Sequence, residues 1–457
     1  MAVACGSYIT LTATESGEMY SFGSNGIHFE GAPAWMLRRD TIEPMYNPNF
    51  GSEEVAMVAA CGENRAVVTK QGSLWTWGRM DTIGHRVPGI PGRIGSDYFG
   101  DTVVMASCGS MSIIVLTSSG RVWTCGKNDR CTPHNPDTFR LVHPILFNNR
   151  KIVMVASGSM HKMAVDQDGM LWTWGDNFSG ELCMAQRPLV PGYGSQSPVA
   201  IAPAIFHGDK VVHVSGGYQN TMVVTENGSL WACGRGWDGE LGIGAGDDEI
   251  FVPRRVGGSE MFGGAGVRMT SCGPHHTLIV GTDNRVWACG NGEKHALGNG
   301  DTTDCRVPTV LPDTDKFTNG RVMTVAAGKN HSVAVMRDGT VYTWGKGTYS
   351  FFDDASRPRP GGTGHRDMPF VFEPTRLKPA LFHRARIGHW HESSWLHVHP
   401  EHGLAVAMGQ HDRLGAHSPL MSSPAELIHR YLQDDMHFMA NYSAGLLALL
   451  GLHEKSV

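Results

Sequence analysis

The chain has 457 residues, of which 41% are hydrophobic and only 18% are charged, and its formal net charge is −5. Because it has no overall positive charge, it has no general attraction for nucleic acid or for an anionic membrane surface, and we expect neither as a direct ligand. The 58 glycines and the scarcity of charge are typical of short strands joined by tight turns.

The chain begins directly with a strand-like segment, without the charged start and apolar stretch of a secretory signal. Its longest apolar run, residues 444–452, is much shorter than the roughly 20 residues that a membrane-spanning helix needs. We therefore expect a soluble intracellular protein, cytoplasmic or nuclear, that has no membrane contact and is monomeric.

A unit of two strands joined by a tight turn recurs seven times in residues 1–380. Each copy closes on an aromatic residue or a cysteine followed by glycine, at Phe22-Gly23, Trp77-Gly78, Cys125-Gly126, Trp174-Gly175, Cys233-Gly234, Cys289-Gly290 and Trp344-Gly345. Successive copies lie between 48 and 59 residues apart. A supersecondary unit repeated at a period of about 50 residues predicts an array of similar units within one domain.

Apolar residues alternate along both strands of a unit, as in residues 331–336 and 340–344. The turns between them carry two-residue hairpin signals, which in chain order are Ser16-Gly17, Gln71-Gly72, Ser119-Gly120, Asp168-Gly169, Asn227-Gly228, Asp283-Asn284 and Asp338-Gly339. Asn284 replaces glycine at a position expected to need a positive φ. The linkers supply further strands at residues 253–256, 308–311 and 374–377, each beginning with a proline that suits an edge strand. The prediction is an all-β fold, a seven-bladed β-propeller of four-stranded antiparallel blades, followed by a short α-helical C-terminal tail.

The ten cysteines do not suggest a disulfide framework or a zinc site. Seven of them occupy repeat positions, four before the first glycine of a unit and three in the closing slot, namely Cys5, Cys61, Cys108, Cys272, Cys125, Cys233 and Cys289. No Cys-x-x-Cys pair is present. We expect reduced cysteines that pack as small hydrophobic residues.

The units resemble the repeats of the regulator of chromosome condensation family. The clearest matches run from Gly328 to Gly345, from Gly273 to Gly290 and from Gly158 to Leu182. The resemblance implies a seven-bladed propeller whose ring closes by pairing between the two chain ends. It assigns structural roles to the matching positions Gly158, His161, Gly169, Trp174, Gly175, Gly273, His276, Gly290, Gly328, His331, Gly339, Trp344 and Gly345.

The motif histidine is present in only three of the seven units, as His161, His276 and His331. In the other four units we place Ile9, Arg65, Ser112 and Asn220 at this position. Chemistry that needed seven equivalent groups would not tolerate this variation. We therefore predict that each histidine makes a hydrogen bond that fixes a neighbouring loop.

The favoured function is a protein–protein interaction scaffold that binds its partner through loops on one propeller face, where a rigid framework carries variable segments. Candidate partner-binding residues lie in the loops that follow the closing glycines, and they are Trp237, Asp238, Asp247, Asp248, Arg357 and Arg359. No nucleophile–base signature, phosphate-binding loop or paired-carboxylate pattern is present, so we predict no enzyme and no cofactor.

Two alternatives stay open. The first, implied by the resemblance, is a guanine-nucleotide exchange factor for a Ran-like small GTPase. Such a factor needs a projecting wedge to displace the nucleotide, whereas the long linkers at 185–203 and 347–369 suit irregular loops better. A substrate-adaptor subunit of a ubiquitin ligase is the other, because Ser423 and Glu426 form a helix-capping box ahead of an apolar face.

Residues 381–457 are predicted as a second region with a ring-closing strand near 385–389, a histidine-rich segment and C-terminal helices. Residues 400–415 fit either a degenerate eighth unit or a helix, and we favour the helix. The histidines of the segment are weak candidates for zinc ligands, namely His389, His391, His397, His399 and His402. No cysteine lies near them, so we predict no metal site and an ordinary polar surface.

Overall fold

The computed structural model describes residues 2–7, 9–23, 43–45, 50, 52–78, 91–126, 138–184, 194–244, 248–312, 321–346, 363, 365 and 370–377. The chain divides into two units, Met1–Met408 and Gly409–Val457, and all described residues belong to the first. The strand near 385–389, the segment 400–415 and the predicted C-terminal helices lie outside the described residues.

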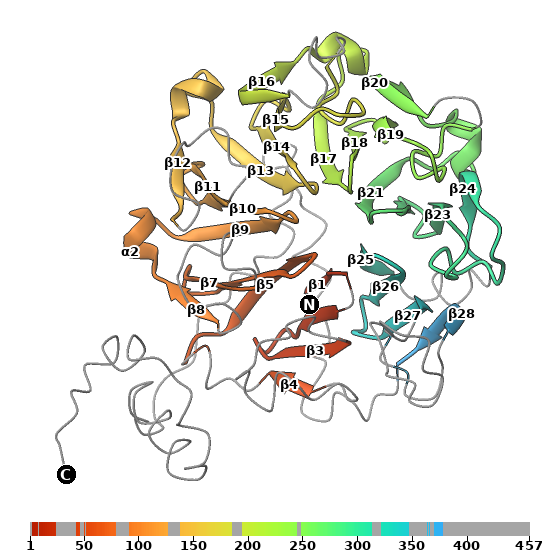
Figure 1. Ribbon diagram of the computed structural model, residues 1–457, viewed down its shortest axis with the longest axis horizontal. Helices are drawn as coiled ribbons and strands as arrows, with labels where there is room; N and C mark the ends of the chain where they lie inside the picture. The colour runs from red at the N-terminus through yellow and green to blue at the C-terminus, as the bar shows by residue number, and fades with distance from the viewer. Residues whose placement is uncertain are drawn as a thin grey trace, which may run out of the picture. The chain divides into compact units, whose positions relative to one another are not determined.

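Seven antiparallel sheets of four consecutive strands form the blades of a β-propeller, as predicted (Figure 1). Blade 1 comprises β1 (Ala2–Cys5), β2 (Ile9–Ala13), β3 (Met19–Gly23) and β4 (Glu43–Met45). Blade 2 comprises β5 (Val55–Cys61), β6 (Asn64–Thr69), β7 (Leu74–Trp77) and β8 (Gly92–Ile94). Blade 3 comprises β9 (Val103–Cys108), β10 (Ser112–Thr117), β11 (Val122–Gly126) and β12 (Arg140–Val142).

The second half of the ring repeats this order. Blade 4 comprises β13 (Ile152–Ser157), β14 (His161–Asp166), β15 (Leu171–Gly175) and β16 (Ser195–Ile201). Blade 5 comprises β17 (Val211–Gly216), β18 (Asn220–Thr225), β19 (Leu230–Arg235) and β20 (Glu249–Arg255). Blade 6 comprises β21 (Val267–Cys272), β22 (His276–Gly281), β23 (Val286–Gly290) and β24 (Cys305–Val310). Blade 7 comprises β25 (Val322–Ala327), β26 (His331–Met336), β27 (Val341–Lys346) and β28 (Phe370–Arg376).

The first strand of each blade lies innermost, beside the first strands of its two neighbours, and the fourth strand lies at the rim (Figure 1). The predicted linker strands are these rim strands. They begin several residues before the expected prolines, and those prolines lie inside β20, β24 and β28 at edge positions. The hairpin turns have the expected geometry, with φ of 80° at Gly339 and 69° at Asn284.

Connections between blades supply an aromatic contact that the sequence analysis did not predict. A phenylalanine lies just before the first strand of a blade, in α2 (Ser96–Phe99) or in one of the 3-10 helices Pro144–Phe147, Pro203–Phe206 and Ser259–Phe262. It packs edge-to-face on a tryptophan of that blade's third strand, with ring centroids 5.6 Å apart for Phe147 and Trp172 and 5.8 Å apart for Phe206 and Trp231. The tryptophans of the closing strands are therefore packing residues.

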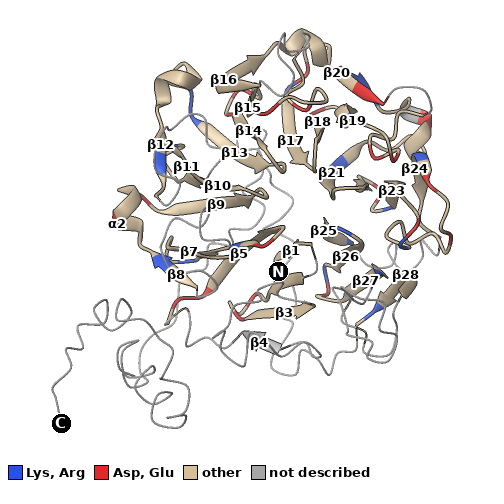
Figure 2. Ribbon diagram, viewed as in Figure 1, with Lys and Arg blue, Asp and Glu red and all other residues tan. Residues whose placement is uncertain are grey.

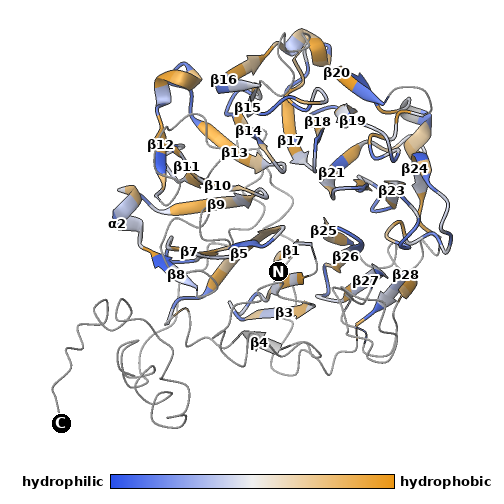
Figure 3. Ribbon diagram, viewed as in Figure 1, coloured by the Kyte–Doolittle hydropathy of each residue, from blue (hydrophilic) through white to orange (hydrophobic). Residues whose placement is uncertain are grey.

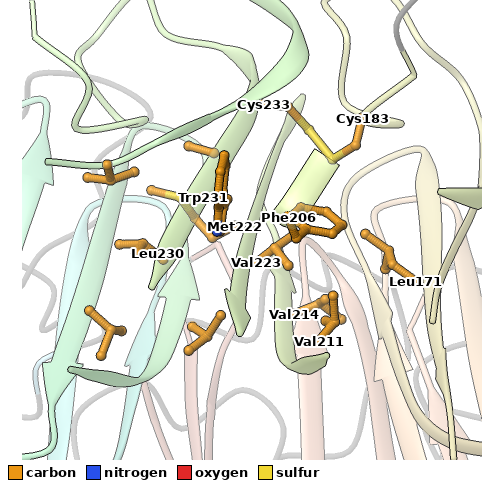
Figure 4. Packing of buried hydrophobic residues seen from close by; sticks show 14 of the residues in the cluster. Leu171, Cys183, Phe206, Val211, Val214, Met222, Val223, Leu230, Trp231 and Cys233 are labelled. Atoms are coloured by element: carbon orange, nitrogen blue, oxygen red, sulfur yellow. A yellow bond between two sulfur atoms is a disulfide. The ribbon is translucent and has the colours of Figure 1, made fainter. Parts of the chain in front are cut away.

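Hydrophobic side chains fill the spaces between blades. One continuous cluster joins blades 4, 5 and 6 and includes Leu171, Met222, Trp231 and Ile279 (Figure 4). Strand segments throughout the ring carry hydrophobic residues (Figure 3). Among the residues that the structure describes, no helix has the length and apolar character needed to cross a membrane.

Within the described residues, blades 1 and 7 are each built from consecutive strands, so the pairing expected between the two chain ends does not occur among them. These blades meet through side chains instead. The Cys5 thiol donates to the carbonyl oxygen of Ala326 over 3.5 Å, and a buried cluster that includes Phe22 and Val333 spans the junction. Each blade can therefore complete its own sheet locally, and burial of apolar surface between the end blades closes the ring.

The expectation that all cysteines are reduced is also wrong for one pair. Cys183, in the connection between β15 and β16, forms a disulfide with Cys233 in β19 of the next blade (Figure 4). Their sequence separation of 50 residues hides the pair from rules based on short Cys-x-x-Cys spacings. Other described cysteines stay outside this bond as free thiols, among them Cys5, Cys61, Cys108, Cys272, Cys289 and Cys305.

Candidate protein-binding face

Two sets of connections emerge on the same side of the ring, which we call the loop face. Because the strands within a blade are antiparallel, the first loop (between the first and second strands) and the second loop (between the third and fourth strands) leave the blade at the same end. The hairpin turns and the connections between blades lie on the opposite face. The described candidate partner-binding residues, Trp237, Asp238 and Asp248, belong to the second loop of blade 5.

Glycines of the first loops allow neighbouring blades to approach closely on the loop face. A Cβ atom on Gly217 would lie 2.5 Å from the carbonyl oxygen of Gly273, and one on Gly273 would lie 2.5 Å from the carbonyl oxygen of Gly328. Because these contacts are with backbone, a larger residue has no room unless the blades separate. This explains the glycine that opens each of these first loops.

The motif histidine in blade 4 bridges two blades. His161 Nε2 lies 2.9 Å from the Thr221 hydroxyl in blade 5, and that hydroxyl donates to the carbonyl oxygen of Glu181 in the second loop of blade 4, 2.7 Å away. Since the single proton of the hydroxyl is used in this bond, the His161 Nε2–H donates to the Thr221 oxygen. Complete burial lowers the pKa of His161 to about 3, which agrees with a neutral ring.

The same arrangement recurs around the ring. His276 Nε2 lies 2.8 Å from the Ser332 hydroxyl, which donates to the carbonyl oxygen of Ala296 over 2.7 Å. His331 Nε2 lies 3.0 Å from the Thr10 hydroxyl and joins blade 7 to blade 1. For His161 and His276 these bonds agree with the prediction that the histidine fixes a neighbouring loop, because the hydroxyl of the next blade passes the contact on to a loop carbonyl.

One position in the repeat was assigned incorrectly from sequence. Arg65 pairs with Trp77 as Lys162 pairs with Trp174, so Asn64 and not Arg65 occupies the histidine position of blade 2. Asn64 Nδ2 donates to a backbone carbonyl in the first loop of blade 3 over 2.8 Å. The error arose because the second unit is one residue shorter than the others between its first and closing glycines.

Second loops of blades 4, 5 and 6 each extend over the next blade. Their leucines Leu182, Leu241 and Leu297 are almost completely buried between blades. Gly180 has φ of 100°, and a Cβ atom there would lie 2.4 Å from the carbonyl oxygen of Ile250 in β20. These loops are thus part of the packed framework, and only their outer residues are available to a partner.

The most prominent exposed feature of these loops is a surface that we call the Trp237 surface, made of Tyr218, Arg235, Trp237, Asp238 and His275. Trp237 is 54% exposed and Tyr218 is 42% exposed. The Arg235 guanidinium carbon lies 4.9 Å from the Trp237 ring centre and 5.8 Å from that of Tyr218. Both rings therefore contact a cation on one side, and this contact orients them.

Ionic contacts hold this surface in place. Arg235 Nη2 lies 2.6 Å from Asp238 Oδ2, and His275 Nδ1 from blade 6 lies 2.9 Å from the same oxygen. The buried Glu240 accepts the backbone N–H of Asp238 over 2.8 Å and lies 3.3 Å from Arg235 Nε. Burial raises the pKa of Glu240 to about 7.

Neighbouring elements complete the base of the loop. Arg306 of β24 donates to the carbonyl oxygen of Trp237 over 3.2 Å, and Gly236 N–H donates to the carbonyl oxygen of Asp248 over 2.9 Å. A further exposed aromatic residue, Phe178, projects from the second loop of blade 4 and is 44% exposed. Acidic segments recur in the connections beside β20 and β24 (Figure 2).

The structure brings together Trp237 and Asp238, and places the exposed Asp248 at the end of the same loop. Asp247, Arg357 and Arg359 lie outside the described residues, as do the five histidines considered as zinc ligands. Within the described ranges, no group of three or more His, Cys, Asp or Glu residues can hold a metal ion. Tyr218, Arg235 and His275 were not predicted from the sequence, since their only signal was their position beside the repeat glycines.

Comparison with known proteins gives a consistent picture. A model of the RCC1-like domain matches residues 31–393. The Mus musculus regulator of chromosome condensation is 26% identical over 356 residues, which is 72% of this chain and 80% of that protein. The Homo sapiens E3 ubiquitin-protein ligase HERC2 is 35% identical over 142 residues, so the match covers 31% of this chain and 3% of the ligase. The solved structure of Prp20p from Saccharomyces cerevisiae has a TM-score of 0.64 at 20% identity, covering 80% of this chain and 87% of that one, and shows the same fold.

Proposed function

Because the chain belongs to the family of proteins with an RCC1-like domain, we propose that it is a protein-interaction scaffold that binds another protein through the loop face of its propeller. The binding site is the Trp237 surface. The scaffold acts as a monomer without cofactor or catalytic residues, and it works inside the cell, in the cytoplasm or the nucleus. Its composition argues against direct binding of nucleic acid.

The observation that carries this proposal is that the Trp237 side chain is exposed while hydrogen bonds fix the backbone of its loop. An exposed tryptophan offers a large contact area, and tryptophan, tyrosine and arginine are the residues that most often dominate protein–protein binding. Here all three lie together, and contacts with Asp238 and Arg306 already order the loop before a partner arrives. A pre-ordered site loses less conformational entropy on binding, so more of the contact energy appears as affinity.

Exchange of guanine nucleotide on a Ran-like small GTPase is the second candidate. Its support is the long match to the mouse regulator of chromosome condensation and the fold shared with Prp20p, whose structure was reported with its binding to Gsp1p and histones. A substrate-adaptor role in a ubiquitin ligase is the third, supported by the match to part of HERC2. Both roles also require a protein partner on the propeller.

Affinity capture with the full tagged chain tests the proposal. In quantitative mass spectrometry, Trp237→Ala should capture at least tenfold less of the proteins that the wild type captures. Truncation of a central tryptophan costs about 2 kcal/mol or more of binding free energy. Ile145→Ala is the matched control, because Ile145 is 61% exposed on the opposite face. Capture profiles that are the same for the wild type and both variants would refute a site at Trp237.

A nucleotide-release assay separates the candidates. A Ran-like GTPase loaded with fluorescent GDP is mixed with the wild type and with Trp237→Ala. Release accelerated by the wild type supports exchange activity, and release unchanged by an excess of the protein rejects it while leaving the scaffold intact. Recovery of ubiquitin-ligase subunits in the capture experiment would favour the adaptor.

A further inference from the structure

The disulfide partner Cys183 occupies a position that is glycine in the two following blades. Cys183, Gly242 and Gly298 each follow the buried leucine of a second loop, and their φ angles are 57°, 68° and 74°. Residues other than glycine rarely adopt this conformation because the Cβ atom meets the backbone. A cysteine at such a position therefore needs an interaction that offsets the strain.

The two glycines show where a side chain at this position points. A Cβ atom on Gly242 would lie 3.1 Å from Cys289 Sγ, and one on Gly298 would lie 2.6 Å from Trp344 Cδ1. Both targets are closing-strand residues of the next blade. In blade 5 the equivalent residue is Cys233, and the Cα atoms of Cys183 and Cys233 are 5.6 Å apart, a separation typical of disulfides.

We propose that Cys183 and Cys233 form a reversible thiol–disulfide site that takes a small-molecule disulfide such as glutathione disulfide, and that its oxidised form locks the second loop of blade 4 onto blade 5. In the reduced form the loop keeps the hydrogen bond from Thr221 to the Glu181 carbonyl and the buried Leu182. The reduced loop loses the covalent link to blade 5 but keeps Cys183 at its unfavourable positive φ. Reduction therefore allows the loop to open.

The chemistry balances without a metal or an enzyme. The Cys183 thiol loses its proton and attacks glutathione disulfide, forming a mixed disulfide and releasing one glutathione thiolate. The Cys233 thiolate then attacks the Cys183 sulfur and releases the second glutathione. Two protons leave the protein and two are taken up by the released thiolates, so two cysteines are oxidised while one glutathione disulfide is reduced.

Burial controls the rate of this exchange. Both cysteine side chains are 0% exposed, so a thiolate reaches them only after the loop opens. We expect exchange to be slow in the folded protein and fast in denaturant. Disulfides inside cells are usually transient and redox-sensing, which agrees with a switch if the protein works there as proposed.

The lock also bears on partner binding, and this part rests on the proposed function. The locked loop carries Phe178, which is 44% exposed on the same face as the Trp237 surface. Fixing the loop removes conformational freedom that a partner contacting Phe178 has to restrict. We expect the oxidised protein to retain partners more strongly than the reduced protein.

The first test measures the bond itself. Full-length protein is equilibrated with glutathione disulfide or with dithiothreitol, and its free cysteines are then alkylated in denaturant, so that burial does not protect them, and mapped by mass spectrometry. We expect Cys183 and Cys233 to be protected only in the oxidised sample, whose Tm is higher by roughly 5 °C for a link of this span. Cys183→Gly restores the repeat glycine and should remove the dependence of Tm on reductant, whereas Cys305→Ser should keep it.

Labelling of both cysteines after oxidation, or an identical Tm in the two samples, would overturn the proposal. Partner capture is then compared between the oxidised wild type, the reduced wild type and Cys183→Gly. If Trp237→Ala leaves capture unchanged while the Tm difference persists, the binding site is wrong and the redox site stands. If capture depends on Trp237 but Tm does not respond to reductant, the redox site is wrong and the scaffold stands.

Discussion

A second disulfide can be built from the geometry that joins Cys183 to Cys233. Gly242→Cys places its Cβ atom 3.1 Å from Cys289 Sγ, and across a disulfide a Cβ atom lies about 3 Å from the partner sulfur because the S–S bond is about 2.05 Å long. The new link would join blades 5 and 6 at the equivalent position. Gly242→Ser adds a side chain of similar size without a sulfur and is the matched control.

The expected gain follows from two opposing terms. A link across 47 residues constrains the unfolded chain by about 4 kcal/mol. Replacing glycine at φ of 68° costs about 1–2 kcal/mol, and the Cβ atom also meets Pro308 at 3.0 Å. The net gain is about 2–3 kcal/mol, or about 3–4 °C in Tm for a propeller of this size.

Intact mass, thiol mapping and thermal unfolding test this prediction. After treatment with glutathione disulfide, Gly242→Cys should lose two more thiols than the wild type, show a link to Cys289 and melt above the wild type. In dithiothreitol it should melt below the wild type, as Gly242→Ser does in both conditions. A variant that stays unlinked after oxidation would refute the inferred direction of the side chain at this repeat position, which Cys183 shares.

Two further predictions concern the histidines that bridge the blades. His276→Ala removes a buried ring and leaves the Ser332 hydroxyl without its donor. The free energy of unfolding should therefore fall by about 2–4 kcal/mol. A urea midpoint equal to that of the wild type would mean that the bridge does not stabilise the propeller. Burial lowers the pKa of His276 to about 3 and that of His331 to about 4, so the neutral rings stabilise the fold fully above about pH 6.5, and this stability is lost as pH falls toward the folded values. Burial raises the pKa of Glu181 and Glu240 from the ordinary 4.5 to about 7, so these two groups act in the opposite direction between pH 4.5 and 7. The test therefore compares the wild type with His276→Gln at each pH between 7.5 and 5. The stability difference between the two proteins should shrink on acidification, and a constant difference would contradict the assignment of a buried neutral ring.

Local patterns in the sequence were sufficient to predict the propeller. Alternating apolar residues and the turn dipeptides report on the first three strands of one blade, where paired residues lie at most 14 positions apart, as His161 and Gly175 do. The repeat period reports how often this unit recurs. Single positions were assigned incorrectly where the spacing within a unit changed, so Arg65 was assigned to the histidine position that Asn64 occupies in blade 2. A hydrogen-bonded, loop-fixing role for His161 and His276 could also be predicted, because buried polar groups need partners.

Only the tertiary structure decided what the neighbouring blades do to one another. Arg235, Tyr218 and His275 meet Trp237 or Asp238 across as many as 37 residues, and Cys183 meets Cys233 across 50. Closure of the ring by packing of Cys5 against Ala326 joins residues 321 apart. These contacts depend on the conformations of the loops and on how far each second loop extends over the next blade. The repeat pattern within one blade encodes neither of these properties. The sequence by itself therefore determined the blades, while the arrangement of their loops in space determined the candidate binding site and the redox site.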